Sequence, residues 1–133
     1  MAQVANFSST PNIGIGQVLT ANTARDGTGT LATIFTAGAS GARVDKLDCQ
    51  AIATTTAGML RFFMFDGTNS RLFYELPVGA VTPSGTNPAW RSTMSQDAVG
   101  QEIFPIILEA NEQIRVSTNN AETFNVIATG GNF

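Results

Sequence analysis

Apolar and polar residues alternate along most of this chain with a period of two residues. The clearest alternation covers residues 43–54, where Leu47, Cys49 and Ala51 fall on one face and mostly polar side chains on the other. A period of two is typical of a β-strand with one buried face. No stretch sustains the 3.6-residue apolar period of a helix, so the pattern predicts an all-β protein.

The densest aromatic cluster lies in residues 58–78, which hold four of the nine phenylalanines and the only tyrosine. Two apolar-rich runs, 59–65 and 72–76, flank the turn-forming residues 66–70, and this arrangement predicts a β-hairpin. Apolar residues on both faces of the first run are typical of a strand whose two faces are both buried. By alternation, we expect one face of the hairpin to supply six core side chains, namely Leu60, Phe62, Met64, Leu72, Tyr74 and Leu76.

The other face of this hairpin carries Phe63, Phe65 and Phe73 beside Arg61, Arg71 and Glu75. A monomer should not leave three phenylalanines in water, because large exposed apolar patches mark interaction sites. We therefore predict that this face meets a partner, unless the same chain covers it.

Turn residues separate eight or nine short strands at fairly even spacing. A single sheet of this size would leave one apolar side wet, so we predict a two-sheet sandwich of jelly-roll type. An immunoglobulin-like sandwich is the alternative, although the Cys, Trp, Cys spacing of that fold is missing. The expected strands are 13–20, 30–36, 43–54, 59–65, 72–76, 89–96, 102–108, 113–118 and 122–129.

Residues 1–12 are mostly polar and end in Ser-Ser-Thr-Pro-Asn, which predicts an extended N-terminal arm before a single domain at 13–133. The arm is either a frayed terminus or a segment whose Val4 and Phe7 dock on a neighbouring subunit. In the strand that follows, Gly14 and Gly16 predict a bulge or a close backbone approach. They do not make a nucleotide fingerprint, because Leu19 stands where its third glycine would be.

Charged residues make up only 13% of the chain, about half the usual share, so the surface is weakly solvated and suited to assembly. Six arginines and Lys46 are scattered along a chain of net charge −3, which argues against nucleic-acid binding. The N-terminus lacks a secretory pattern and the longest apolar run is strand-sized, so we expect a soluble protein that does not span a membrane. Cys49 is the only cysteine, so no intrachain disulfide can form, and we expect it to be buried as a small apolar residue.

Candidate catalytic groups are sparse. The absence of histidine removes the usual general base and metal ligand, and the carboxylate pairs Asp45 with Asp48 and Glu109 with Glu112 have structural positions on a strand and at a turn. Calcium ligands could come from Asp26, Asp66 or Asp97, but no loop has the dense spacing of a specific calcium site. We therefore predict no enzymatic activity, no cofactor and no metal.

Four segments follow one another along most of the chain, namely ANFSSTPNIGIGQVLTANTARDGTGT, TAGASGARVDKLDCQA, MLRFFMFDGTNSRLFYELPV and STNNAETFNVIATGG. Their order resembles the jelly-roll cement, or decoration, proteins of tailed bacteriophages. The resemblance implies a virion structural protein that is made in the host cytoplasm and binds the outside of the capsid shell. Its implied partners are the major capsid protein and further copies of itself, as a homodimer or, alternatively, a homotrimer.

The residues expected to contact capsid or neighbouring subunits lie on arms, loops and the second face of the hairpin. They are Val4, Phe7, Arg25, Asp26, Phe63, Phe65, Phe73 and Phe133. A competing hypothesis is a receptor- or carbohydrate-binding module of a virion fibre or tail, because a jelly roll serves that role equally well. In that case Trp90, Tyr74 and Arg91 would form the platform for a sugar.

Overall fold

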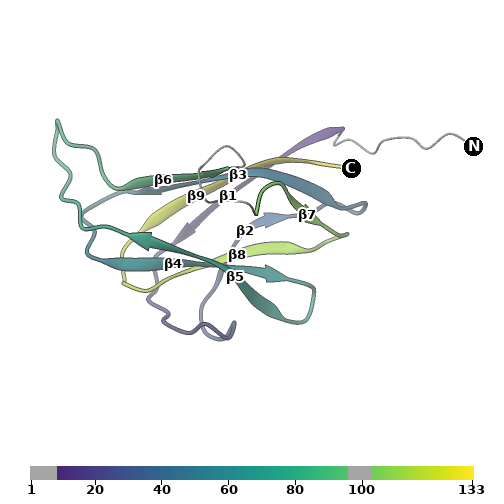
Figure 1. Ribbon diagram of the computed structural model, residues 1–133, viewed down its shortest axis with the longest axis horizontal. Helices are drawn as coiled ribbons and strands as arrows, with labels where there is room; N and C mark the ends of the chain where they lie inside the picture. The colour runs from purple at the N-terminus through teal and green to yellow at the C-terminus, as the bar shows by residue number, and fades with distance from the viewer. Residues whose placement is uncertain (1–8, 96–102) are drawn as a thin grey trace, which may run out of the picture.

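The computed structural model of the protein describes residues 9–95 and 103–133. Two antiparallel sheets pack face to face (Figure 1), and the all-β prediction is confirmed. Nowhere in the described ranges is there a helix long and apolar enough to cross a membrane. The strands of the described residues are β1 (Thr10–Val18), β2 (Ala32–Thr36), β3 (Ala42–Ala51), β4 (Gly58–Phe65), β5 (Ser70–Val78), β6 (Arg91–Ser95), β7 (Ile106–Leu108), β8 (Gln113–Thr118) and β9 (Phe124–Asn132).

The strand pairing is nested from the ends of the chain inward. β1 pairs with β9, β2 with β8, β3 with β6 and β7, and β4 with β5. β6 and β7 pair with successive parts of β3 and act as two pieces of one edge strand. The first sheet has the order β1-β9-β3-β6, with β7 also on β3, and the second sheet has the order β2-β8-β4-β5. This nested order is that of a jelly roll rather than an immunoglobulin sandwich.

The core fills the space between the two sheets. Leu47, Cys49 and Ala51 of β3 point into it, as their alternation predicted. Each fully buried large apolar side chain contributes about 1.5–3 kcal/mol relative to an exposed one. Large core side chains include Ile34, Phe35, Leu47, Leu60, Phe62, Met94, Phe104, Leu108, Ile114 and Phe124.

The hairpin of β4 and β5 contains a bulge. Phe62 pairs with Tyr74 but Phe63 pairs with Leu72, so Phe73 is an extra residue in β5. This one-residue shift places Leu72 opposite Phe63 on the outer face, while the ring of Phe73 lies 6.5 Å from that of Phe62 and packs against the core. The predicted core position of Leu72 is therefore wrong. Of the other five predicted core residues, Leu60, Phe62 and Leu76 are fully inside and Met64 and Tyr74 pack against them half-buried.

β1 begins at Thr10, three residues earlier than expected, because residues 10–12 already pair with the end of β9. Its glycines reflect a close approach to β2. A Cβ added at Gly14 would overlap the carbonyl oxygen of Ile34, and one added at Gly16 would lie 2.6 Å from the Ile34 Cγ2 atom. The predicted close backbone approach is confirmed, and it fixes β1 against the edge of the second sheet.

Candidate binding surface

The outer face of the second sheet is covered by the loop that joins β1 to β2, residues 19–31, hereafter the 19–31 loop. Asn22 donates its backbone N–H to the carbonyl of Thr118 at 2.8 Å, and its side-chain amide donates to the carbonyls of Thr28 and Thr30. Gly27, with φ +88°, passes so close to Ser70 of β5 that a Cβ there would overlap the Ser70 carbonyl oxygen. The loop is polar in sequence, yet it lies against the sheet as a cover.

Under this loop, outward-pointing side chains of the second sheet are removed from water. Phe63 is 0% exposed, Ser117 is 0% exposed and Arg61 is 4% exposed. The Arg61 guanidinium donates to the Glu75 carboxylate at 3.0 Å and to the Asn119 side-chain oxygen at 3.1 Å, which compensates its burial. Phe63 therefore presents no surface to a partner, and its burial does not support the predicted role in a subunit contact.

Arg25 and Asp26, two predicted contact residues, are exposed but have structural partners within the chain. Arg25 donates to Glu75 at 2.8 Å and so ties the 19–31 loop to β5. Hydrogen bonding from Arg25, followed by that from Arg61, holds the pKa of Glu75 below its ordinary value. The Asp26 carboxylate accepts the side-chain hydroxyl and the backbone N–H of Thr28, and these bonds lower its pKa.

The other predicted contact residues are half-buried or lie outside the described residues. Phe65 is half-buried beneath the Arg115 guanidinium, 3.5 Å from the ring centroid. Phe73 packs against the core, and Phe133 is half-buried with its backbone N–H bonded to the carbonyl of Gly41 at 3.2 Å. Val4 and Phe7 fall in residues 1–8, outside the described ranges.

The outer face of the first sheet has no such cover in the described part of the chain. Ile15 is 76% exposed, and the other large apolar side chains exposed in residues 9–95 and 103–133 have exposed fractions down to 39%. Strand alternation places all of them on this outer face, with Leu19 and Ile52 one residue beyond their strands. Exposed large apolar side chains gathered on one face mark interaction sites. These residues, hereafter the apolar face, are Ile13, Ile15, Leu19, Ile52, Ile107 and Ile127.

Strand register brings members of the apolar face together. Ile15 lies directly opposite Ile127, which in turn lies opposite Asp48 of β3. One row along, Gln17 donates to the side-chain oxygen of Asn125 at 2.8 Å, so these amides satisfy each other. An apolar row therefore runs across β1 and β9 and ends at a charged group on β3.

That charged group is internally paired. Asp48 lies 3.5 Å from Lys46 Nζ and 3.6 Å from an Arg91 nitrogen, and it accepts a hydrogen bond from Thr93. Burial raises the pKa of Asp48, but the Thr93 hydrogen bond and the two cations outweigh it and hold the pKa below its ordinary value. A partner could therefore cover this face without burying a charge that lacks an oppositely charged neighbour.

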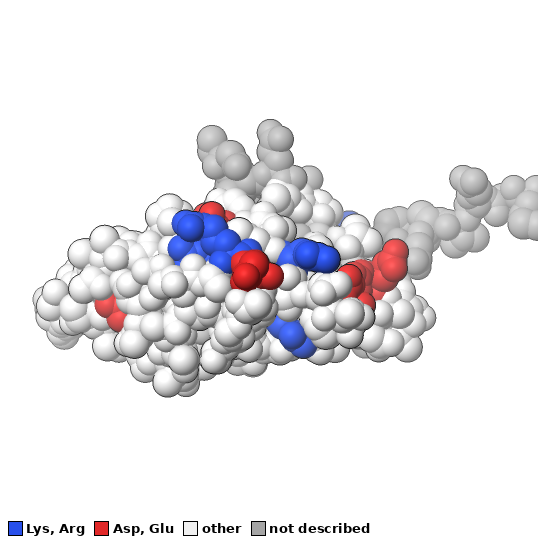
Figure 2. All heavy atoms as spheres, turned by 90° about the horizontal axis from the view of Figure 1, so that it is seen from below, with Lys and Arg blue, Asp and Glu red and all other residues white. Residues whose placement is uncertain are grey.

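Sequence reasoning did not identify the apolar face. Its signal is present in the run Ile13-Gly14-Ile15-Gly16, in which the glycines face the tightly packed inside and the isoleucines face out. Figure 2 looks from the side of the 19–31 loop, where acidic and basic groups lie next to one another within a mostly uncharged surface.

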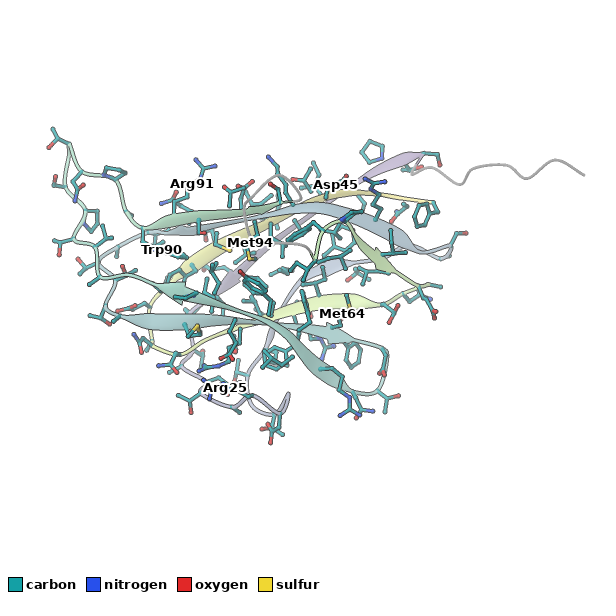
Figure 3. The ribbon with its side chains drawn as sticks, viewed as in Figure 1. Arg25, Asp45, Met64, Trp90, Arg91 and Met94 are labelled. Carbon is teal, nitrogen blue, oxygen red and sulfur yellow. The ribbon has the colours of Figure 1, made fainter. Side chains whose placement is uncertain are left out.

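The predicted sugar platform is not assembled. Trp90 packs edge-on against Phe124, with ring centroids 5.7 Å apart, and belongs to the side chains packed on the core. Arg91 points away from the sandwich in Figure 3, on the opposite side of β6 from Met94. Tyr74 lies in the second sheet, where with Leu72, Phe73 and Glu75 it lines an open hollow of about 290 Å³.

The carboxylates considered for catalysis have partners of their own. Asp45 pairs with Arg43 at 2.7 Å, and the Glu112 carboxylate accepts the backbone N–H of Glu109 at 2.6 Å. Asp66 caps its turn by accepting the N–H groups of Asn69 and Thr68, and these bonds lower its pKa. Among the residues described, no three acidic or cysteine side chains lie together as a metal site would require. Asp97 falls outside those residues.

Comparison with known proteins finds a similarity among solved structures. No protein-family model and no curated protein sequence matches the chain. Among solved structures, the chain is similar to one described as the cyanophage Pam1 capsid asymmetric unit. The two share 17% sequence identity with a TM-score of 0.43, over 100% of this chain and 92% of the other.

Proposed function

We propose that this protein is a cement, or decoration, protein of a tailed bacteriophage, which binds the outer surface of the major capsid shell across subunit junctions. Two things support the proposal. One is the resemblance of the sequence to that class of protein. The other is the apolar face, which gives an otherwise weakly charged jelly roll a surface suited to a protein partner.

The apolar face carries the proposal because its composition matches the core of a protein interface. It holds branched apolar side chains and mutually bonded amides, with charges that are already paired at one end. Covering it releases water from apolar surface and desolvates few free charges. On a shell the same contact repeats at every symmetry-related position, so each single contact can be weak while the multivalent lattice is fully occupied.

Co-sedimentation of the purified protein with expanded shells tests this proposal. The variants are Leu19→Lys, Ile52→Lys and Ile107→Lys, which place a charge at the ends of the apolar face and leave β1 unchanged. We expect each to weaken shell binding by at least about tenfold, the factor that corresponds to 1.4 kcal/mol. Thr28→Lys and Thr68→Lys are the matched controls, because they add the same charge to exposed loops on the side of the second sheet.

The controls should bind shells as the wild-type protein does. Failure of the wild-type protein to bind shells, or equal loss in variants and controls, would contradict the proposal. In the proposal the protein is made in the host cytoplasm, acts on the capsid exterior and catalyses no reaction.

The alternative is a receptor- or carbohydrate-binding module, and the hollow along β5 is the observation in its favour. Tyr74 and Phe73 line that hollow, and aromatic surfaces are what sugars stack on. Glycan-binding measurements with the wild-type protein and with Tyr74→Ala test it. If the wild-type protein binds no host surface glycan, the alternative is wrong.

A further inference from the structure

The edges of the two sheets differ in how they are protected against pairing with another chain. An edge strand exposes unpaired N–H and C=O groups, and proteins usually blunt it with charge, proline, bulges or short length. β5 carries Arg71, Glu75, Pro77 and the bulge at Phe73. β2 has five residues and an irregular register, and the edge opposite β1 is split into the short strands β6 and β7.

β1 lacks the charged side chains, the bulge and the short length that protect these edges. It is nine residues long, its register with β9 is unbroken, and among the described strands it pairs only with β9. It contains no charged side chain, and the first charged residue of the whole chain is Arg25. Its one proline, Pro11, lies next to its beginning. β1 is therefore the edge best suited to extending the sheet.

We infer that β1 pairs with β1 of a second copy of this chain, antiparallel and around a two-fold axis at Gly14. Gly14 is the middle residue of Thr10–Val18, so this register pairs the full length of both strands. It also keeps the two outer faces on the same side of the joined sheet, because opposed residues in an antiparallel pair point to the same face.

Side chains support the same register. It places Ile13 directly opposite Ile15 of the partner subunit, and the two-fold axis creates this pair twice. Each Ile15 already lies opposite Ile127 in its own chain, so the rows of exposed isoleucines become continuous across the dimer. Two identical strands with charges would oppose like charges in some register, but β1 has none to oppose.

This inference goes beyond the capsid proposal and does not depend on it. The joined sheet would present two apolar faces as one surface, whatever partner covers it. The test below uses only the purified protein, so its failure would leave the shell-binding proposal untouched, and the reverse is also true.

Sedimentation equilibrium of the full-length protein measures the self-association. We expect a dimer whose dissociation constant rises at least tenfold in the double variant Ile13→Lys with Ile15→Lys, because the register opposes the new charges. The double variant Ile52→Lys with Ile107→Lys is the matched control. It adds two lysines at exposed positions of the same outer face, away from β1, and should dimerise as the wild-type protein does.

A wild-type protein that stays monomeric, that forms a trimer, or whose dimer resists the β1 lysines would overturn the inference. Deleting residues 1–8 examines the other possible occupant of the edge, the N-terminal segment of the same chain. If that segment occupies the edge, the wild-type protein is monomeric and the deletion makes it dimerise, which also overturns the inference.

Disulfide trapping tests the register itself and does not depend on how the lysine variants fold. The double variant Ile13→Cys with Ile15→Cys should form a covalent dimer under mild oxidation, since opposed strand residues lie within the Cα distance of a disulfide. Native Cys49 is buried and will not compete. The matched variant Ile52→Cys with Ile107→Cys should remain uncrosslinked, and equal crosslinking of both would contradict the register.

Discussion

The outer faces of the two sheets are built from similar strands, but the described part of the chain covers one of them and leaves the other exposed to solvent. The second sheet carries Phe63 and Arg61 on its outside, and the chain buries both under its own 19–31 loop. The first sheet carries exposed isoleucines on its outside, and no described segment covers them. The chain itself therefore buries the apolar side chain on one outer face, while the apolar side chains on the other face stay exposed.

This difference indicates where a partner binds. Sequence pattern alone suggested that the aromatic face of the hairpin was the partner surface, because three phenylalanines point there by alternation. The structure shows that loop contacts and one bulge account for Phe63 and Phe73 within a single chain. The apolar surface that no described segment of the chain covers lies on the other sheet.

The largest expected effect separates the two faces by stability. Phe63→Ala should cost about 3–5 kcal/mol of unfolding free energy, as for a core phenylalanine, because the 19–31 loop buries the ring completely. Ile52→Ala on the open face, away from β1, should change it by no more than about 0.5 kcal/mol. Chemical denaturation of both variants measures this, and similar values for the two would break the contrast.

The second prediction concerns the cover itself. Gly27→Ala should destabilise the protein by about 1–3 kcal/mol, because φ is +88° and the new methyl group would overlap the Ser70 carbonyl oxygen. Gly85→Ala is the control, since the same methyl group there meets nothing within 4 Å. Thermal unfolding of both variants gives the comparison. A stable Gly27→Ala variant would mean that the loop does not hold its place on the sheet.

A smaller effect depends on pH. The folded-state pKa of Glu75 is lower than the ordinary value of 4.5, so its pairing with Arg25 and Arg61 adds stability above that value. That stability is lost as pH falls below 4.5 and through the folded-state pKa. We expect Glu75→Gln to be less stable than wild type at pH 7 and to lose less on acidification. Denaturant midpoints across this range measure it, and parallel pH profiles would show that Glu75 does not anchor the loop.

The smallest effect on stability should accompany a large effect on binding. Ile107→Ser removes an apolar side chain from the open face, so we expect the unfolding free energy to change within about 0.5 kcal/mol. Shell binding should nevertheless weaken, because the lost contact belongs to the proposed interface. Denaturation and co-sedimentation on the same preparation measure both. A marked loss of stability would place Ile107 in the fold rather than in the interface.

The strands and the fold class could be predicted because they follow from local patterns. Alternation places Leu47 and Cys49 in the core, and turn residues separate every observed strand. Alternation failed at Leu72, because a bulge shifts the phase by one residue and no residue type near it marks the shift. The burial of Phe63 could not be predicted from the sequence either. It depends on a polar loop that folds back over the sheet through Asn22 and Arg25, which are contacts between residues far apart in sequence.

The exposure of the isoleucines could not be predicted from the local pattern for the same reason. Ile13 and Ile15 read as an ordinary strand, and their exposure follows from Gly14 and Gly16 lying against β2. Which face points outward is set by tertiary packing, which the sequence pattern does not carry.

The most direct test is whether shell binding protects the open face and spares the covered one. Burial raises the pKa of the Cys49 thiol to about 12, so the native cysteine should stay unreactive and a single introduced thiol can be followed. Ile107→Cys and Thr28→Cys are each labelled with a thiol reagent, free in solution and bound to shells. The account predicts that binding strongly slows labelling of the Ile107→Cys variant and leaves the Thr28→Cys variant unchanged. Protection of the Thr28→Cys variant alone would contradict it.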